Sequence, residues 1–269
     1  MNLFFRTLGQ GDRNLIIIHG LYGSSDNWLS VARLLGDQFK IFIIDQRNHG
    51  QSPHSSDMNY GLMAEDVHEF MQQQQINKAV VMGHSMGGKA AMLFALRYPR
   101  WVEKLVILDI APKSYNSFSN YAQITNDHRQ IVDGLLSVNP AEYQSRNAID
   151  KVLKAAIPND MVRSFLLKNI GRNQDKQLYW KLNIKAISKN LNYIMDGVKE
   201  FDTSDEFPNE KGVVIIRGAK SSYVQDEDMQ QVRKYFPSAQ LADIPNAGHW
   251  LHAEQTDLFI KTVKYFLNA

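Results

Sequence analysis

Residues 79–98 read AVVMGHSMGGKAAMLFALRY, and this stretch decides the fold. The apolar run at 79–82 predicts a buried strand, and residues 86–98 have helical spacing. Between them, Gly83 and Gly87 flank Ser85 in the G-x-S-x-G pattern of a nucleophilic serine on a sharp strand-to-helix turn. Glycines at these two positions let the strand and the helix pack closely. The alternative is a glycine-rich turn with an inert serine.

Further apolar runs lie on both sides of this stretch, each followed by a turn and most by a helical pattern. The runs occupy residues 15–18, 41–44, 105–108 and 213–216, and the helical patterns 24–35, 60–75, 225–236 and 254–267. The segment 239–244 is expected to form the last strand. Near-continuous apolar runs suit strands that are buried on both faces of a parallel sheet. Strand alternating with helix predicts an α/β fold, with a mostly parallel sheet of about seven strands flanked by helices.

The alternation stops between residues 114 and 202, where no strand pattern is evident. Helical stretches occur there at 118–136, 141–156, 160–170 and 178–198. Because a structureless loop of this length is improbable, we expect a helical cap inserted after the strand that ends near Leu108. The core then comprises 1–113 and 203–269, and the cap 114–202. Its aromatic residues either line a substrate cavity or form the cap's own core; they are Phe118, Tyr121, Phe165, Tyr179 and Trp180.

A nucleophilic serine needs a general base, and His249 is the best candidate among eight histidines. It follows the segment 239–244, the last expected strand. We expect His252 to be an early helix residue with a surface or packing role, and His84 to have a packing role. His49 lies in a loop after a strand, where stabilising a turn is the default role.

The acid that orients the base is unusual in this sequence. Most enzymes with this arrangement of strands and helices carry the acid in a G-x-x-D motif after the strand that follows the inserted segment. Here that stretch reads Gly218-Ala219-Lys220-Ser221, with serine in place of aspartate. Asp109 ends the strand after the nucleophile helix, at the sheet edge where ligands bind, so we expect it to be the acid. The alternative for Asp109 is a structural cap of the next turn. The carboxylates at 226–228 stand where a helix dipole alone would favour them.

An oxyanion hole requires two backbone N–H groups close to the nucleophile. Met86, directly after Ser85, supplies the first. The loop His19-Gly20-Leu21-Tyr22-Gly23 follows an earlier strand, and its glycines allow a close approach to the substrate. We therefore expect the N–H of Leu21 to be the second donor.

Composition excludes several classes of protein. The 269 residues include 30 Lys and Arg against 28 Asp and Glu, a net charge of +2, so charge indicates no nucleic-acid or anionic-membrane partner. There is no cysteine, which removes disulfides and thiolate metal sites, and the histidine spacing suggests no metal site. The longest apolar run, 90–96, is far short of the roughly 20 residues of a spanning helix. With no signal peptide evident, we expect a cytoplasmic monomer or dimer.

Together these motifs resemble the α/β-hydrolases, and more narrowly the bacterial YbfF-type acyl esterases. The matching residues are 19–24, 45–52, 83–90, 109–112, 221–224 and 248–254. The resemblance implies that Asp109 is the triad aspartate and that Ser221, in place of the usual acid, assists the histidine. It also implies activity on esters of short to medium acyl chains, including acyl-CoA thioesters. The short segment before Leu15 predicts one strand fewer than the full eight.

The predicted function is therefore serine acyl hydrolysis of a small-molecule ester or thioester. Ser85 attacks, His249 transfers the proton, Asp109 orients the imidazole, and Ser221 hydrogen-bonds the same ring. No cofactor is expected. Two alternatives stay open: a C–C bond hydrolase or lyase on the same scaffold, and a non-catalytic small-molecule binding protein.

Overall fold

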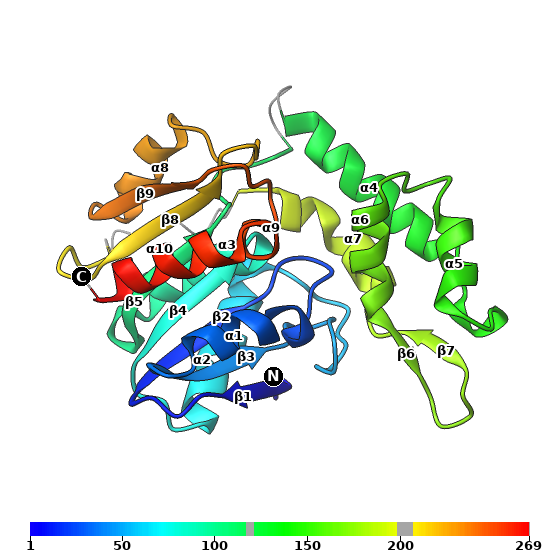
Figure 1. Cartoon of the computed structure of the whole chain (residues 1–269), viewed down its shortest axis with the longest axis horizontal. Coiled ribbons are helices and arrows are strands. Elements are labelled where there is room, and N and C mark those ends of the chain that lie inside the picture. Colours follow the sequence, from blue (N-terminus) through cyan, green and yellow to red (C-terminus); the bar gives the residue numbers. More distant parts are fainter. Residues whose placement is uncertain (117–120, 198–206, 269) are drawn as a thin grey trace.

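The computed structural model of the protein describes residues 1–116, 121–197 and 207–268. A seven-stranded sheet in the order β1-β3-β2-β4-β5-β8-β9 forms its centre (Figure 1). Neighbouring strands are parallel except β1 and β3, which are antiparallel. The strands are β1 (Phe5–Leu8), β2 (Arg13–Ile18), β3 (Phe39–Ile44), β4 (Ala79–His84), β5 (Val102–Leu108), β8 (Val213–Gly218) and β9 (Ala239–Ile244). The predicted mostly parallel sheet of about seven strands is confirmed.

Helices cover both faces of the sheet, which explains why the strand sequences are apolar without alternation. In β2, Ile16 and Ile18 face one hydrophobic core, and Leu15 and Ile17 face the other. The first core includes residues of α2 (Tyr60–Gln73), α3 (Met86–Arg97) and α8 (Asp228–Tyr235). The second includes residues of α1 (Leu29–Leu35), α9 (Leu251–Glu254) and α10 (Thr256–Asn268). Short 3-10 turns, η1 (Ser25–Trp28) and η2 (Pro99–Trp101), precede α1 and β5.

A separate group of helices, the helical insertion, follows β5 and lies beside the sheet, on the right in Figure 1. It contains α4 (Ala122–Leu136), η4 (Pro140–Glu142), α5 (Arg146–Leu153), α6 (Asp160–Leu166), η5 (Leu167–Asn169), β6 (Ile170–Arg172), β7 (Leu178–Trp180) and α7 (Ile184–Met195). The expectation that this region lacks strands, and that a helix spans 178–198, is wrong at the antiparallel hairpin β6–β7. Strands of three residues are too short to show a period of two.

The two ends of the helical insertion lie side by side and contact α3, the helix that follows Ser85. Tyr115 donates its N–H to the carbonyl of Met195 at 2.9 Å. The buried ammonium of Lys89, on α3, donates to the carbonyls of Lys113 at 2.9 Å and Asp196 at 2.6 Å. Entry and exit are thus adjacent, as an insertion between two strands requires. The division into a core and a cap stays a prediction, and its second boundary, 202/203, lies outside the described residues.

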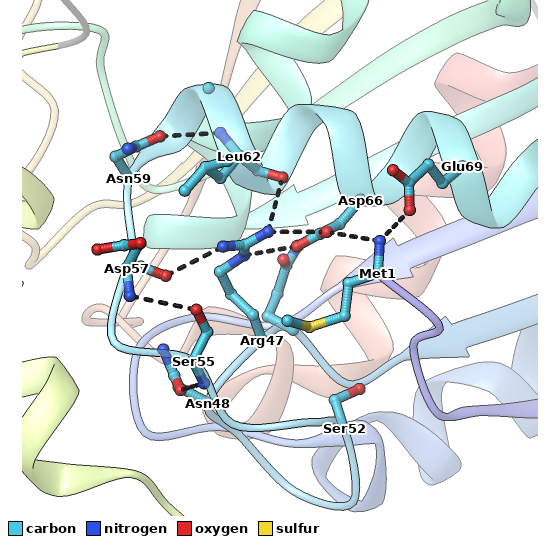
Figure 2. Close-up of polar contacts among 12 residues, drawn as sticks. Met1, Arg47, Asn48, Ser52, Ser55, Asp57, Asn59, Leu62, Asp66 and Glu69 are labelled. Carbon is cyan, nitrogen blue, oxygen red and sulfur yellow. Dashed lines mark hydrogen bonds and ion pairs between the residues drawn. The ribbon is translucent and has the colours of Figure 1, made fainter.

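The loop after β3 is held against α2 by a buried ion pair, shown in Figure 2. Arg47 contacts both carboxylate oxygens of Asp66, at 2.6 and 2.9 Å, and donates to the carbonyl of Asp57 at 3.0 Å. Bidentate pairing with further hydrogen bonds is the geometry in which a buried ion pair is tolerated. It fixes the backbone of the loop that carries His49.

Candidate active site

Ser85 stands at the turn between β4 and α3, as the spacing of the glycines predicts. Its backbone has φ 53° and ψ −121°, a strained conformation for a residue with a side chain. A Cβ at Gly83 would lie 2.3 Å from the carbonyl oxygen of Gly87. A Cβ at Gly87 would lie 2.4 Å from the carbonyl oxygens of Ile18 and His19. Only glycine fits at either place, so the motif is required by the packing of the turn.

Asp109 and His249 meet across the carboxyl ends of the strands. Oδ2 of Asp109 accepts a hydrogen bond from Nδ1 of His249 at 2.7 Å. The carboxylate is fully buried, and its Oδ1 accepts the N–H of Gly218 at 3.1 Å. Asp109 also has a positive φ of 50°. Because Nδ1 of His249 donates to Asp109, the ring is held in the tautomer that leaves Nε2 unprotonated and able to accept a proton.

Ser221 lies beside the same carboxylate, but its contact differs from the expectation. Its hydroxyl donates to Oδ2 of Asp109, the atom that also accepts from His249. The prediction that Ser221 hydrogen-bonds the imidazole ring is therefore wrong in this geometry. Nδ1 of the ring is already bonded to Asp109, so the serine contacts the carboxylate that holds the ring.

Two further side chains hold His249 that sequence reasoning did not assign to this task. The ring of Tyr223 stacks on the imidazole, with centroids 3.8 Å apart and planes 16° from parallel. Nε2 of His84 donates to the carbonyl of His249 at 2.9 Å. Burial lowers the pKa of His84 well below its ordinary value, so this ring stays neutral. Its role goes beyond the packing expected for it.

His252 is the packing residue that the sequence suggested as one of two options. It is buried at the start of α9 and stacks on Trp28, with ring centroids 4.1 Å apart and planes at 12°. Burial lowers the pKa of His252 to about 3. Its ring thus belongs to the wall of the site, and His249 remains the candidate base.

The expected oxyanion donors lie on either side of Ser85. Met86 is the first residue of α3, and a first-turn N–H has no acceptor inside its own helix. Leu21 lies in the turn that follows β2. Within the described part of the chain, neither N–H group has a hydrogen-bond acceptor. Both are free to donate to a substrate oxygen.

The loop that carries Leu21 is clamped at the next residue. Tyr22 has a positive φ of 62° and donates its N–H to Nε2 of His49 at 3.1 Å. Nδ1 of His49 bonds the carbonyl of Arg47 at 2.9 Å, the turn-stabilising role expected for it. The carbonyl of Tyr22 accepts from the buried amide of Asn169, in the helical insertion, at 2.8 Å. Two segments distant in sequence therefore fix this loop, which no local pattern could reveal.

Ser85 and His249 both line a cavity of about 270 Å³, the large cavity. The helical insertion supplies one wall through Ile124, Asp127, His128, Ile131, Val162, Phe165 and Leu166. Phe165 is the aromatic residue for which the cavity-lining interpretation is correct. Tyr121, Tyr179 and Trp180 lie outside this lining, and Phe118 lies outside the described residues. His128 was missed; its Nε2 lies 3.2 Å from the hydroxyl of Tyr223.

The described residues contain no cluster of three side chains that could hold a metal ion. Among them there is also no helix with the length and apolar character needed to cross a membrane.

Comparison with known proteins agrees with this geometry. The profile of the family described as alpha/beta hydrolase fold matches residues 13–256. The sn-1-specific diacylglycerol lipase ABHD11 of Danio rerio is 37% identical over 262 residues, covering 96% of this chain and 80% of that protein. Esterase YbfF of Escherichia coli is 32% identical over 254 residues, covering 94% and 92%. A solved marine microorganism esterase is 44% identical and superposes with a TM-score of 0.91, covering 98% of each chain. The chain therefore belongs to the α/β-hydrolase fold family, as an esterase- or lipase-like hydrolase.

Proposed function

We propose that this protein is a carboxylic ester hydrolase that uses Ser85, His249 and Asp109 as its catalytic triad. The observation that carries the proposal is the 2.7 Å hydrogen bond from His249 to Asp109. His249 lines the same cavity as Ser85, which stands on a strained turn. Nucleophile, base and orienting carboxylate in this order make a serine hydroxyl reactive.

In the acylation step, Oγ of Ser85 bonds to the acyl carbon while Nε2 of His249 takes the hydroxyl proton. The N–H groups of Leu21 and Met86 stabilise the negative oxygen of the tetrahedral intermediate. His249 then gives its proton to the departing oxygen or sulfur as the bond from the acyl carbon to the leaving group breaks. Asp109 stabilises the transient imidazolium, and the hydroxyl of Ser221 supports Asp109.

Deacylation repeats the sequence with water, which His249 deprotonates as it attacks the acyl-serine. Every step uses side chains and backbone groups of this chain, so no cofactor is required. We propose short- to medium-chain acyl esters as substrates, with acyl-CoA thioesters as a further group. The volume of the large cavity, about 270 Å³, is just below the range of about 300–1,000 Å³ for small-molecule sites and agrees with a small substrate. Residues 114–202 would act as the cap that closes it.

The test is burst kinetics on p-nitrophenyl esters from C2 to C12, with Ser85→Ala as the control. An initial burst equal to the enzyme concentration, absent in the variant, is the result expected of an acyl-enzyme route. A folded protein with no turnover on any ester would overturn the proposal and favour C–C bond cleavage or ligand binding. Labelling with a fluorophosphonate separates those two, because a reactive serine gives an adduct at Ser85 and a binding protein gives none.

A further inference from the structure

A second, smaller hollow meets the large cavity at the nucleophile, and we call it the inner chamber. Its walls are formed by Tyr60, Ile110, Tyr115, Ile194 and Met195, together with Ser85. The volume is about 10 Å³, which is close to the room that one water-sized group occupies. The chamber is therefore a methyl-sized recess directly beside the reacting hydroxyl.

The groups that act on the substrate are distributed unevenly over the two hollows. Of the proposed oxyanion donors, Met86 lines the inner chamber, and Leu21 lines both hollows. His249 lines the large cavity and, among the described residues, is absent from the lining of the inner chamber. The side of Ser85 that faces the proton donor is thus the side of the large cavity.

The tetrahedral intermediate has four substituents on the acyl carbon, and three of them have their directions set. One is Oγ of Ser85, and the second is the negative oxygen, which points at the N–H groups. The third is the leaving oxygen, which must lie near Nε2 of His249 to be protonated, and so belongs in the large cavity. The acyl substituent takes the remaining direction, away from His249.

We propose that the inner chamber is the acyl pocket, so that this enzyme selects acetyl-sized acyl groups and places the alcohol in the large cavity. This inference rests on the proposed esterase function and narrows it. The large cavity has apolar walls, including Ile131, Val162 and Phe165, which suit an alkyl or aryl alcohol.

The walls of the inner chamber are fixed, so a longer acyl chain cannot widen it cheaply. The hydroxyl of Tyr60 donates to the carbonyl of Ile194 at 2.6 Å. The hydroxyl of Tyr115 donates to the carbonyl of Tyr223 at 2.9 Å. The Lys89 ammonium, bound to two carbonyls, lies over the rings of both tyrosines, 5.5 and 4.8 Å from their centroids. Room for a longer chain requires breaking buried hydrogen bonds or removing a side chain.

The first test uses the native chain and two ester series. One varies the acyl group of p-nitrophenyl esters from acetate to octanoate, and the other varies the alcohol of acetate esters from methyl to octyl. We expect kcat/KM to fall about tenfold or more for each early lengthening of the acyl chain, because a fixed pocket discriminates by single methylene groups. In the acetate series we expect kcat/KM to hold or rise. An optimum at hexanoate or longer would overturn the inference while leaving the esterase function intact.

The second test enlarges one hollow at a time. Met195→Ala removes a wall of the inner chamber, and Val162→Ala truncates a wall of the large cavity alone. We expect Met195→Ala to shift the acyl optimum to longer chains, raising the butyrate-to-acetate ratio of kcat/KM at least tenfold, whereas Val162→Ala changes the alcohol series only. The same acyl shift in both variants, or in Val162→Ala alone, would overturn the assignment. Should Met195→Ala fail to fold, the two series on the native chain decide the question.

Complete absence of ester turnover in the native chain would be a different failure. It would remove the proposed esterase function itself, whether or not the fluorophosphonate forms an adduct at Ser85. Ester turnover with an optimum at a long acyl chain, together with a fluorophosphonate adduct at Ser85, would remove only the assignment of the inner chamber as the acyl pocket.

Discussion

At the scale of single residues, the chemistry of the site depends on Asp109. Its carboxylate is buried without solvent and accepts three hydrogen bonds, from His249, from the N–H of Gly218 and from the hydroxyl of Ser221. Three donors on a buried carboxylate keep it in one orientation. The imidazole that it orients is therefore held in the tautomer that can accept a proton.

Asp109→Asn is expected to lower kcat by about 10⁴-fold, because an amide no longer specifies that tautomer. KM should change little, since the side chain does not line the large cavity. Steady-state kinetics on p-nitrophenyl acetate measures both constants, and circular dichroism checks that the variant is folded. Turnover near the native value would mean that another group is the acid.

Ser221→Ala is expected to have a smaller effect. It removes one of three donors to Asp109, and a hydrogen bond to a charged group is worth about 1.5–3 kcal/mol, so kcat should fall about tenfold to a hundredfold. Ser238→Ala is a matched control, because that hydroxyl bonds the carbonyl of Lys211 instead. A loss as large as that of Asp109→Asn would show that Ser221 acts on the reaction directly.

The residues of the triad could be found from sequence because each ends or follows a strand. Ser85, Asp109 and His249 sit at the carboxyl ends of parallel strands or just after them, where topology places ligands. Tyr223 and His128 could not be found in this way. Each acts through a contact between segments that are distant in sequence, and no spacing within either segment encodes it.

At the scale of elements, the loop that carries Leu21, a proposed oxyanion donor, is hydrogen-bonded to the helical insertion, and this contact bears on function. Asn169, in η5, holds the carbonyl of Tyr22, while His49 holds its N–H. Tyr22 has a left-handed backbone, which costs about 1–3 kcal/mol and persists only where neighbours enforce it. The insertion therefore helps to keep Leu21 N–H in place, beyond supplying a cavity wall.

Asn169→Ala is expected to lower kcat about tenfold with a smaller change in KM, because the oxyanion donor loses its support. The buried carbonyl left without a partner should also lower the free energy of unfolding by about 1–3 kcal/mol. Asn173→Ala, in the exposed turn of the hairpin, is the matched control. If stability falls and kcat does not, Asn169 is a structural residue only.

The elements themselves were predictable to different degrees. Strands buried on both faces have continuous apolar runs, so β2 to β5 and β8 were evident from sequence. β1 was not identified as a run, because it is an antiparallel edge strand whose four residues are partly exposed. The hairpin β6–β7 was missed because its pairing depends on chain reversal, and three residues a strand leave no periodic signal.

At the scale of the whole molecule, several histidines are buried in their neutral form. Burial lowers the pKa of His19 and His128 to about 4, and that of His49 and His252 to about 3, from an ordinary value of 6.5. The pKa of His84 is lowered as well. Unfolding returns these rings to water, where they bind protons below pH 6.5. The stability that they contribute is thus complete above pH 6.5 and lost as the pH falls toward 3–4.

We therefore expect acid to unfold this protein at mild pH. At pH 5 each of the three buried histidines His19, His49 and His252 has lost about 2 kcal/mol of stability, or about 6 kcal/mol together, against a typical total of about 5–15 kcal/mol. Urea unfolding at pH 7.5, 6 and 5 measures the free energy of unfolding. A value that stays constant from pH 7.5 to 5 would contradict the burial of these rings in their neutral form.

One substitution isolates a single histidine within that sum. His252→Phe keeps a flat ring against Trp28 and removes a buried nitrogen, Nδ1, that has no hydrogen-bond partner in the described residues. The variant should take up one proton fewer on unfolding, so its free energy of unfolding should fall less steeply between pH 6 and 5, by about 1.4 kcal/mol per pH unit. His54→Phe replaces an exposed ring instead of a buried one and serves as the matched control. Equal slopes in the native chain and both variants would mean that the acid sensitivity does not come from the buried ring of His252.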